Sequence, residues 1–234
     1  MEHNIQQSLF FDIETTGLSA DISAITVIGC CDIDGNVTQW FNEDGLSQKQ
    51  IITDFLAFIQ PYNTLITFNG KTFDLPFLKK CAAAYGLNTD VLDNIRSFDL
   101  YRHLRPVKTL LQLENLKLAT LESYLNISRL DQATGKEMIA VYHDYLETGD
   151  KRLYQVLLLH NEDDLKGMPA ILPILSYADF FSSPLFPQAP ELWEGDCTEP
   201  TDTPFLHLTG TASVSVPVPL EYSSGPVNLE LYEN

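Results

Sequence analysis

Cysteines, basic residues and long apolar runs are all scarce in this chain of 234 residues. No stretch approaches the roughly 20 consecutive apolar residues of a membrane-spanning helix, which excludes a transmembrane segment. The first seven residues, MEHNIQQ, contain no basic region followed by an apolar stretch, so no secretory signal is predicted. The four cysteines show no CxxC spacing and no paired framework. We therefore expect free, buried thiols in a cytoplasmic protein.

Basic residues number 14 against 32 acids, and the formal net charge is −18. Every lysine and arginine lies at or before Lys166, whereas residues 167–234 contain nine acids and no base. A protein that binds nucleic acid mainly by neutralising phosphates is expected to be basic. A groove for a phosphate-containing substrate would therefore lie within residues 1–166, and it would need metal ions and a local basic patch.

Apolar residues make up 44% of the chain, enough to fill a sizeable core. Short β-prone runs predict five strands, at residues 8–13, 23–33, 37–41, 64–68 and 95–100. Apolar residues spaced three to four apart predict helices at 51–59, 74–85, 118–125, 138–148 and 151–165, the last of which could extend to 175. Three strands joined by hairpins, followed by alternating helices and strands, are typical of a mixed α/β sheet covered by helices.

The composition changes after residue 176. Five of the 13 prolines lie at residues 176–204, together with acids and no bases. We therefore expect a folded domain at residues 1–176, a Pro-rich acidic linker at 177–204 and a short β-hairpin-like extension at 205–234. The sequence Ser-Ser-Gly-Pro at 223–226 predicts the turn of that hairpin.

The first acidic motif is FDIETTGL at residues 11–18. On a strand, Asp12 and Glu14 are two residues apart, so both carboxylates project from the same face. The apolar residues Leu9, Phe11 and Ile13 fill the other face. Two adjacent like charges are tolerated if a divalent cation lies between them, and hard oxygen ligands suit Mg²⁺ or Mn²⁺. The alternative is a strand with an exposed polar face.

Two further acidic motifs follow, each with an ordinary structural alternative. In FNGKTFDLPFL at residues 68–78, Asp74 opens a predicted helix, where Asp is commonly an N-cap. In LHNEDDL at residues 159–165, His160 and Asp164 are four apart and share one helix face. An acidic cluster on a helix is commonly exposed to solvent, but the apolar residues that flank this one favour packing against the sheet.

In this order and spacing, the three motifs resemble those of the DEDD exonuclease superfamily, whose members share a ribonuclease H-like fold. Within it, the chain is similar to the bacterial YprB-like predicted exonucleases over about residues 7–175. Matching stretches between the motifs are Asp-Leu at 99–100, LESYL at 121–125 and YLxTGD at 145–150. The resemblance implies a mixed five-stranded sheet, with three antiparallel strands and then parallel strands, flanked by helices.

The resemblance also implies roles for individual residues. The implied ligands of two divalent cations, Mg²⁺ or Mn²⁺, are Asp12, Glu14, Asp74 and Asp164. In the family, two such ions activate a water and stabilise the transition state of phosphodiester cleavage. Thr15, Asn69 and Phe73 correspond to substrate positions, of which Asn69 and Phe73 help to hold the terminal nucleotide. Asp99 follows the fifth strand and could either support the site or cap a helix.

His160 departs from the pattern of the family. Related sequences usually have Tyr four residues before the last Asp, and subtypes that use His usually place it five residues before. With that spacing His160 would pair with Leu165, which cannot bind metal, so Asp164 remains the expected ligand. We hypothesise that His160 is the general base, since imidazole titrates near neutral pH. A His160→Ala variant that cleaves at the wild-type rate would contradict this; weakened activity of the site is the alternative.

Basic residues gather after the fifth predicted strand, with few acids among them. They are Arg96, Arg102, His103, Arg105, Lys108 and Lys117. We expect a phosphate-binding stripe there, with Arg102 and Arg105 as substrate-binding residues. Lys71, Lys79 and Lys80 flank the second motif and could add to it. The alternative is that all of these are ordinary solvated charges.

The sequence thus predicts a metal-dependent nuclease, with 3′–5′ exonuclease activity on single-stranded DNA or RNA expected from the resemblance alone. One rival is a binding or scaffold module of the same fold without activity, whose acidic tail engages a protein partner. The net charge and the His160 departure favour it, whereas four intact carboxylates argue against it. A small-molecule phosphodiesterase is a third possibility. The acidic tail could also cover the basic stripe, in which case removing residues 177–234 would raise activity.

Overall fold

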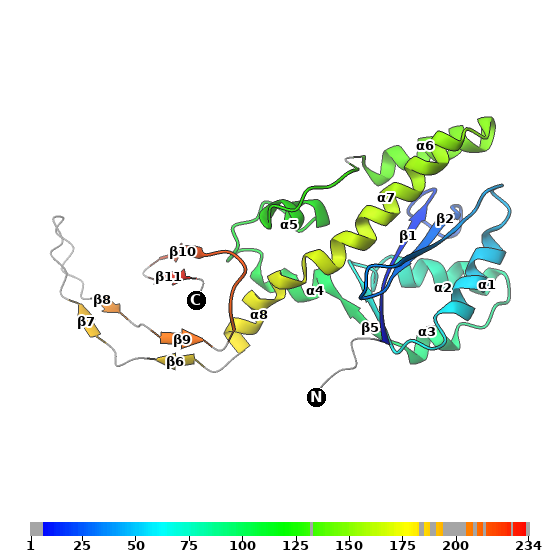
Figure 1. Ribbon diagram of the computed structural model, residues 1–234. Coiled ribbons are helices and arrows are strands. Elements are labelled where there is room, and N and C mark those ends of the chain that lie inside the picture. The colour runs from blue at the N-terminus through cyan, green and yellow to red at the C-terminus, as the bar shows by residue number, and fades with distance from the viewer. Residues whose placement is uncertain are drawn as a thin grey trace. The chain divides into compact units, whose positions relative to one another are not determined.

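The computed structural model describes residues 7–131, 133–182, 185–187, 191–193, 205–207, 210–212, 214–225 and 227–232 (Figure 1). The chain divides into two compact units, Met1–Leu172 and Pro173–Asn234. All three acidic motifs lie in the first unit. In the described part of the chain, no helix is both long and apolar enough to cross a lipid bilayer.

A five-stranded sheet with the strand order β3-β2-β1-β4-β5 forms the centre of the first unit. Its strands are β1 (Ser8–Thr15), β2 (Ile25–Cys31), β3 (Val37–Phe41), β4 (Thr64–Thr67) and β5 (Arg96–Asp99). β2 is antiparallel to both of its neighbours, β1 and β3, whereas β4 runs parallel to β1 and β5 runs parallel to β4. The predicted mixed sheet is therefore confirmed.

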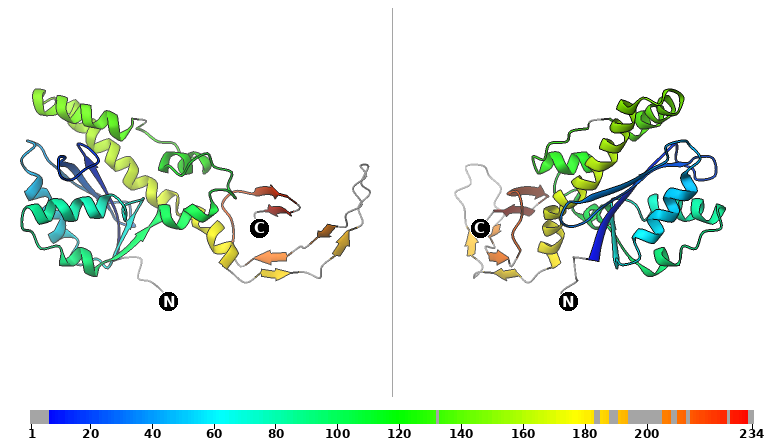
Figure 2. Two further views of the ribbon diagram at one scale, coloured as in Figure 1. Left: turned by 180° about the vertical axis from the view of Figure 1, so that it is seen from behind. Right: turned by 45° about the vertical axis from the view of Figure 1, so that its right-hand side comes forward.

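Helices cover both faces of the sheet (Figures 1 and 2). They are α1 (Gln48–Phe58), α2 (Asp74–Ala84), α3 (Asp90–Asn94), α4 (Leu100–Leu104), α5 (Leu118–Tyr124), α6 (Gly135–Thr148) and α7 (Lys151–Ala170), with a 3₁₀ turn η2 (Arg105–Val107) after α4. The helices α1 and α2 pack on one face, where Phe11 of β1 stacks on Phe55 of α1 at a ring distance of 4.9 Å. The opposite face of β1, β2 and β3 lies against α7.

The alternation of β1 explains this division of faces. Leu9, Phe11 and Ile13 belong to the apolar core with α1 and α2, as expected from the sequence. Asp12 and Glu14, which alternate with them, face the side of the sheet on which α7 lies. The two acidic side chains are thus held between a strand and a long helix.

The long helix and the short elements differ in how well the sequence predicted them. The predicted helix at 151–165 is confirmed, and α7 continues to Ala170 with Pro169 in its last turn. A 3₁₀ turn η3 (Leu172–Ile174) follows. The short helices α3 and α4 were not predicted, because five residues are too few to show a helical period.

Within its described residues, the second unit contains one α-helix and three two-stranded sheets. Its elements are α8 (Leu175–Ser182), β6 (Leu185–Pro187), β7 (Glu191–Trp193), β8 (Phe205–His207), β9 (Gly210–Ala212), β10 (Leu220–Ser224) and β11 (Val227–Leu231). The strands pair as β6–β9, β7–β8 and β10–β11. The predicted hairpin is confirmed, since β10 and β11 are antiparallel with Leu220 opposite Leu231. Where a linker was predicted from residue 177, α8 continues to Ser182, and the rest of that segment lies mostly outside the described residues.

The cysteine prediction agrees with the structure where it can be compared. Cys30, Cys31 and Cys81 are free and buried. Burial raises the pKa of the Cys31 thiol to about 11 and also raises the pKa of Cys81. Cys197 lies outside the described residues.

Candidate active site

The site is built on the end of β1 that extends beyond its neighbour β4. The parallel pairing of the two strands ends at Phe10 and Ile66. Beyond this point the N–H of Ile13 donates to the carboxylate of Asp74, with an N–O distance of 3.2 Å. Asp74 is the first residue of α2 and is only 5% exposed. Phe73 occupies the N-cap position of α2, so Asp74 is the first residue inside the helix and not its N-cap.

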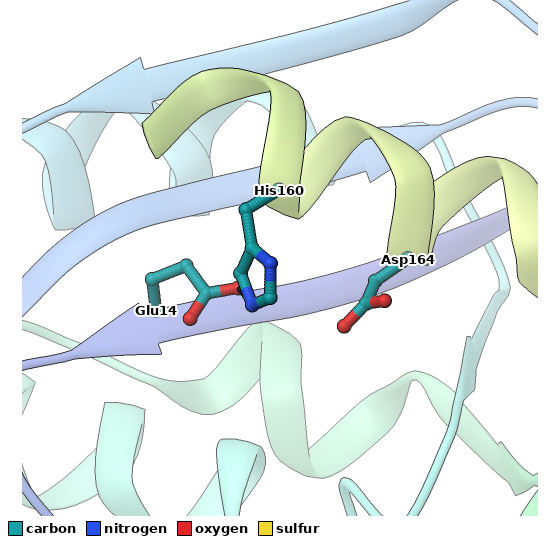
Figure 3. Close-up of side chains that lie close together, drawn as sticks. All are labelled: Glu14, His160 and Asp164. Atoms are coloured by element: carbon teal, nitrogen blue, oxygen red, sulfur yellow. Dashed lines mark ion pairs between the residues drawn. The ribbon is translucent and has the colours of Figure 1, made fainter. Parts of the chain in front are cut away.

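The helix α7 contributes two side chains on the opposite side of the site. His160 and Asp164 are one turn apart and point toward Glu14 on β1 (Figure 3). One ligand atom from each of the three residues lies within 4.8 Å of the other two. Nε2 of His160 is 3.7 Å from Oε1 of Glu14. This spacing fits a small divalent cation, because two atoms that bind one ion are commonly about 3–4 Å apart when each bond is about 2.1 Å.

Asp12 belongs to the same cluster and is held by α7. Nδ2 of Asn161 donates to Oδ2 of Asp12 over 2.8 Å. Nε2 of Gln39 on β3 donates to Oδ1 of Asn161 over 2.9 Å, which fixes the orientation of the amide. Asn161 lies in the third acidic motif, between His160 and Asp164, but no role was predicted for it. The structure shows that it links the first motif to the third.

Burial raises the pKa of three carboxyl groups at the centre of the site, those of Asp12, Glu14 and Asp74. The pKa of Glu14 rises to about 8, mainly because of burial, although the nearby His160 lowers it. Burial also raises the pKa of Asp74 to about 7. The pKa of Asp12 is raised by burial and then by the charges of Asp74, Glu14 and Asp164, so the four carboxyl groups form one electrostatic cluster. A divalent cation would stabilise their charged forms.

The loop before α6 contacts α7 through three consecutive residues, Arg129, Leu130 and Asp131. The Arg129 guanidinium pairs with Glu122 over 3.0 Å and also with Asp164. The N–H groups of Leu130 and Asp131 donate to Oδ2 of Asp163 over 2.9 and 2.6 Å. The Asp131 carboxylate bonds to Nδ1 of His160. None of these contacts was predicted, since Arg129 and Asp131 stand in no recognisable motif.

Opposing effects determine the pKa values of His160 and of Glu122, the partner of Arg129. Burial lowers the pKa of His160, but the Glu14 charge and the hydrogen bond to Asp131 outweigh it, so the pKa is raised. The pKa of Glu122 is raised by burial against the effect of Arg129. The side chain of Glu122 is only 2% exposed, which makes its pairing with Arg129 important for the fold.

The predicted substrate residues lie around the ends of β1, β4 and β5. Thr15 ends β1, and its hydroxyl donates to the carbonyl of Gly17 over 2.9 Å. Asn69 is exposed and adopts a left-handed φ of 65° in the turn after β4. Asp99 accepts from the N–H groups of Asn69, Lys71 and Arg102, so it both caps α4 and fixes this turn. Of the two alternatives raised for Asp99, the helix cap is therefore confirmed.

Phe73 lies against the core, whereas the predicted substrate-binding residues Arg102 and Arg105 are exposed. Phe73 is partly buried against the core, with its ring 5.5 Å from that of Phe77. Arg102 on α4 and Arg105 at the start of η2 are both exposed. Arg96 begins β5, at the opposite end of the strand from Asp99, so it lies apart from these two. Of the lysines near the second motif, Lys79 and Lys80 form ion pairs with Asp93 and Asp21.

Comparisons with known proteins agree with this fold. The chain is 27% identical over 181 residues to the uncharacterized protein YprB of Bacillus subtilis (strain 168), a match that covers 71% of this chain and 41% of the relative. The structure resembles the family B DNA polymerase of the hyperthermophilic archaeon Pyrobaculum calidifontis, with a TM-score of 0.57 and 18% identity. That match covers 74% of this chain but 25% of the polymerase, so the chain spans less than half the length of either protein.

A family model supplies the classification. The model of the RNase_H superfamily matches residues 9–175, which include all three acidic motifs and the complete five-stranded sheet. Membership in this superfamily supports nuclease activity in general, and a divalent metal is the usual cofactor of such nucleases. The carboxylates and the imidazole found together here are suitable ligands for one. The chain therefore belongs to the RNase_H superfamily.

Proposed function

We propose that this protein is a metal-dependent 3′–5′ exonuclease that hydrolyses single-stranded DNA or RNA with two divalent cations, Mg²⁺ or Mn²⁺. The observation that carries the proposal is the convergence of carboxylates from β1, α2 and α7, together with the burial that raises the pKa values of those on β1 and α2. Like charges in one buried cluster destabilise the fold unless cations neutralise them. The direction of cleavage and the single-stranded substrate rest on the resemblance to DEDD exonucleases.

The proposed metal ligands are Asp12, Glu14, Asp74 and Asp164. Their oxygen atoms are the hard donors that Mg²⁺ and Mn²⁺ prefer. When bound, the two cations would lower the pKa of the attacking water and neutralise charge that develops on the scissile phosphate. Asn161 supports this arrangement, because its amide holds one oxygen of Asp12 and leaves the other free to bind a cation.

We propose His160 as the general base. Its Nδ1 is engaged by Asp131, whereas its Nε2 faces Glu14 and the carboxylate cluster. A neutral imidazole in this position can accept a proton from water at Nε2. His160 is 6% exposed, so bulk solvent competes little for that nitrogen.

The substrate would approach along the rim formed by the ends of β1, β4 and β5. Thr15, Asn69 and Phe73 are proposed to contact the terminal nucleotide, Phe73 through its ring. Arg102 and Arg105 are exposed on α4 and η2 and are proposed to bind phosphates further along the strand. These few positive charges suit a short binding site in an otherwise acidic protein.

One observation favours a second candidate, a module that binds nucleic acid or protein without cleaving it. The Arg129 guanidinium already pairs with Asp164, one of the four proposed ligands. A positively charged side chain that pairs with a ligand carboxylate can neutralise that carboxylate in place of a metal ion. The net charge of −18 adds to this, because it disfavours long contacts with nucleic acid.

Time-resolved cleavage of 5′-labelled single-stranded oligonucleotides tests the proposal. DNA and RNA are each incubated with Mn²⁺, Mg²⁺ or EDTA, beside an Asp12→Ala variant and the control Asp54→Asn on α1. We expect a metal-dependent ladder that shortens from the 3′ end and is absent only for Asp12→Ala. No cleavage by folded protein would favour the binding module. Turnover of a small chromogenic phosphodiester, without cleavage of oligonucleotides, would indicate a small-molecule phosphodiesterase.

A further inference from the structure

Both ring nitrogens of His160 are oriented by acidic neighbours. Nδ1 bonds to Oδ2 of Asp131, and Nε2 lies 3.7 Å from Oε1 of Glu14. The side chains of His160, Asp131 and Glu14 are 7%, 11% and 13% exposed. Water therefore competes little with these contacts, and the ring has a defined orientation between a loop on one side and a strand on the other.

The chemistry of the Asp131 contact selects one tautomer of the ring. An ionised carboxylate has no proton to donate, so Nδ1 of His160 must carry the hydrogen of the shared bond. In the neutral ring, Nε2 then keeps its lone pair and points it toward the carboxylate cluster. In the opposite tautomer Nε2 carries the hydrogen, so Nε2 could not accept a proton from water.

Asp131 is itself held firmly against α7. Its N–H donates to Asp163, one residue before the proposed ligand Asp164. Two residues earlier, Arg129 pairs with Asp164 itself. These two contacts hold the loop against α7. They therefore fix the position of the Asp131 carboxylate relative to the imidazole ring of His160.

We propose that Asp131 is a positioning residue, which holds His160 in the Nδ1–H tautomer so that Nε2 can accept the proton of the attacking water. The inference rests on the proposed function. The water proton passes to Nε2, the hydroxide oxygen bonds to phosphorus, and the leaving oxygen of the nucleotide departs. The imidazolium that forms is stabilised by the Asp131 carboxylate through the hydrogen bond at Nδ1.

The tautomer can be measured without any activity. The full chain is labelled with ¹⁵N-histidine and studied by NMR in the presence of Mg²⁺, over a pH range that includes the neutral ring. A His160→Gln variant identifies the signals of His160 among the five histidines. We expect a protonated Nδ1 and an unprotonated Nε2. A protonated Nε2 in the neutral ring would overturn the proposal, even if no variant of Asp131 folds.

The Asp131→Asn variant then tests the consequence for the rate. Asparagine can donate to Nδ1, so the Nε2–H tautomer should appear in the spectrum. We expect kcat for oligonucleotide cleavage to fall roughly 10- to 100-fold, with KM and the affinity for Mn²⁺ alone nearly unchanged. The control Asp54→Asn removes one partly exposed carboxylate from α1 and should match the wild type. An unchanged tautomer, or a rate within about twofold of the wild type, would overturn the proposal.

Failure of the proposed function is distinguishable from failure of this inference. If the wild type cleaves no oligonucleotide, the exonuclease proposal is wrong, and the catalytic part of the inference falls with it. The NMR spectrum still decides whether Asp131 fixes the ring. If the wild type cleaves and Asp131→Asn cleaves equally fast, only the positioning role is wrong.

Discussion

A Cβ atom at Gly29 of β2 would lie 2.0 Å from Oδ1 of Asn161 on α7, so the helix packs directly against the backbone of the strand. The same atom would lie 2.6 Å from Cδ1 of Leu165. Gly29 is opposite Asp12 in the pairing of β1 and β2. The missing side chain therefore permits the close approach that lets Asn161 reach Asp12. The position of a proposed metal ligand depends on a glycine in the neighbouring strand.

Gly29→Ala should disturb both stability and metal binding. The added methyl group must displace Asn161 or move α7 away, and we expect the free energy of unfolding to fall by about 1–3 kcal/mol. The affinity for Mn²⁺ should fall as well, because Asp12 loses its amide partner. Urea denaturation with EDTA and calorimetric titration with Mn²⁺ measure the two effects. Gly135→Ala is the control, since a Cβ at that helical position meets nothing within 4 Å. Equal stability of Gly29→Ala and wild type would show that α7 adjusts without cost.

Replacing the amides between β3, α7 and β1 should give graded losses of metal affinity. Asn161→Ala removes the donor to Asp12, and we expect Mn²⁺ to bind roughly 10- to 100-fold more weakly. Gln39→Ala should have a smaller effect on metal affinity, because it leaves the Asn161 donor in place and frees its amide to rotate, although it also removes a hydrogen bond to the carbonyl of Leu158. The control Gln50→Ala removes an exposed amide on α1 that bonds to Asp54. The reverse order of effects, with Gln39→Ala the more damaging, would contradict a relay from Gln39 through Asn161.

The main elements of the fold could be predicted from the sequence because each has a local pattern. In β1 the alternation of Leu9, Phe11 and Ile13 with Asp12 and Glu14 identified both the strand and its two faces. The turn at 223–226 likewise identified the hairpin of β10 and β11. Local patterns fail for elements as short as α4, whose five residues complete little more than one turn.

The supporting side chains of the site could not be predicted, for a different reason. Asp131 precedes His160 by 29 residues, Arg129 precedes Asp164 by 35, and Asn161 is 149 residues from Asp12. Such pairs have no common spacing, and each partner alone is an ordinary polar residue. Only the packing of α7 against the sheet and the loop brings them together. The four proposed ligands were identifiable because they stand in motifs that resemble a known family.

Loss of Arg129 should destabilise the protein through the buried Glu122. Arg129→Ala leaves the carboxylate of Glu122 without its partner at 2% exposure, and we expect a loss of about 3–5 kcal/mol. Adding Glu122→Gln to this variant should restore part of the stability, because no unpaired charge is then buried. The control Arg152→Ala breaks a pair in which the arginine is 87% exposed, and it should leave the stability nearly unchanged. Chemical denaturation of the wild type and the three variants measures these values. A double variant less stable than Arg129→Ala would show that the hydrogen bonds of Glu122, rather than its charge, dominate.

Without metal, the protein should become less stable as the pH rises from about 5 to about 8. The pKa of Glu14 is raised to about 8 and that of Asp74 to about 7 in the fold, from ordinary values of 4.5 and 3.8. Between these limits the folded state binds more protons than the unfolded state, so the free energy of unfolding falls with rising pH. The raised pKa of His160 acts in the same direction. The carboxyl groups with lowered pKa values, such as Asp32 and Glu137, titrate below this window and do not offset the trend.

Thermal melts in EDTA at several pH values, repeated with Mn²⁺, measure this dependence. We expect the melting temperature in EDTA to decrease toward pH 8, and Mn²⁺ to raise it most at that end, where the carboxylates are ionised and can bind the ion. Glu14→Gln should flatten the profile in EDTA, because its amide cannot ionise, and it should also reduce the shift caused by Mn²⁺. The control Asp54→Asn, on α1, should leave both profiles unchanged. A wild-type profile that is flat in EDTA would mean that the four carboxylates carry no electrostatic cost, and the physical reason for a metal at this site would be lost.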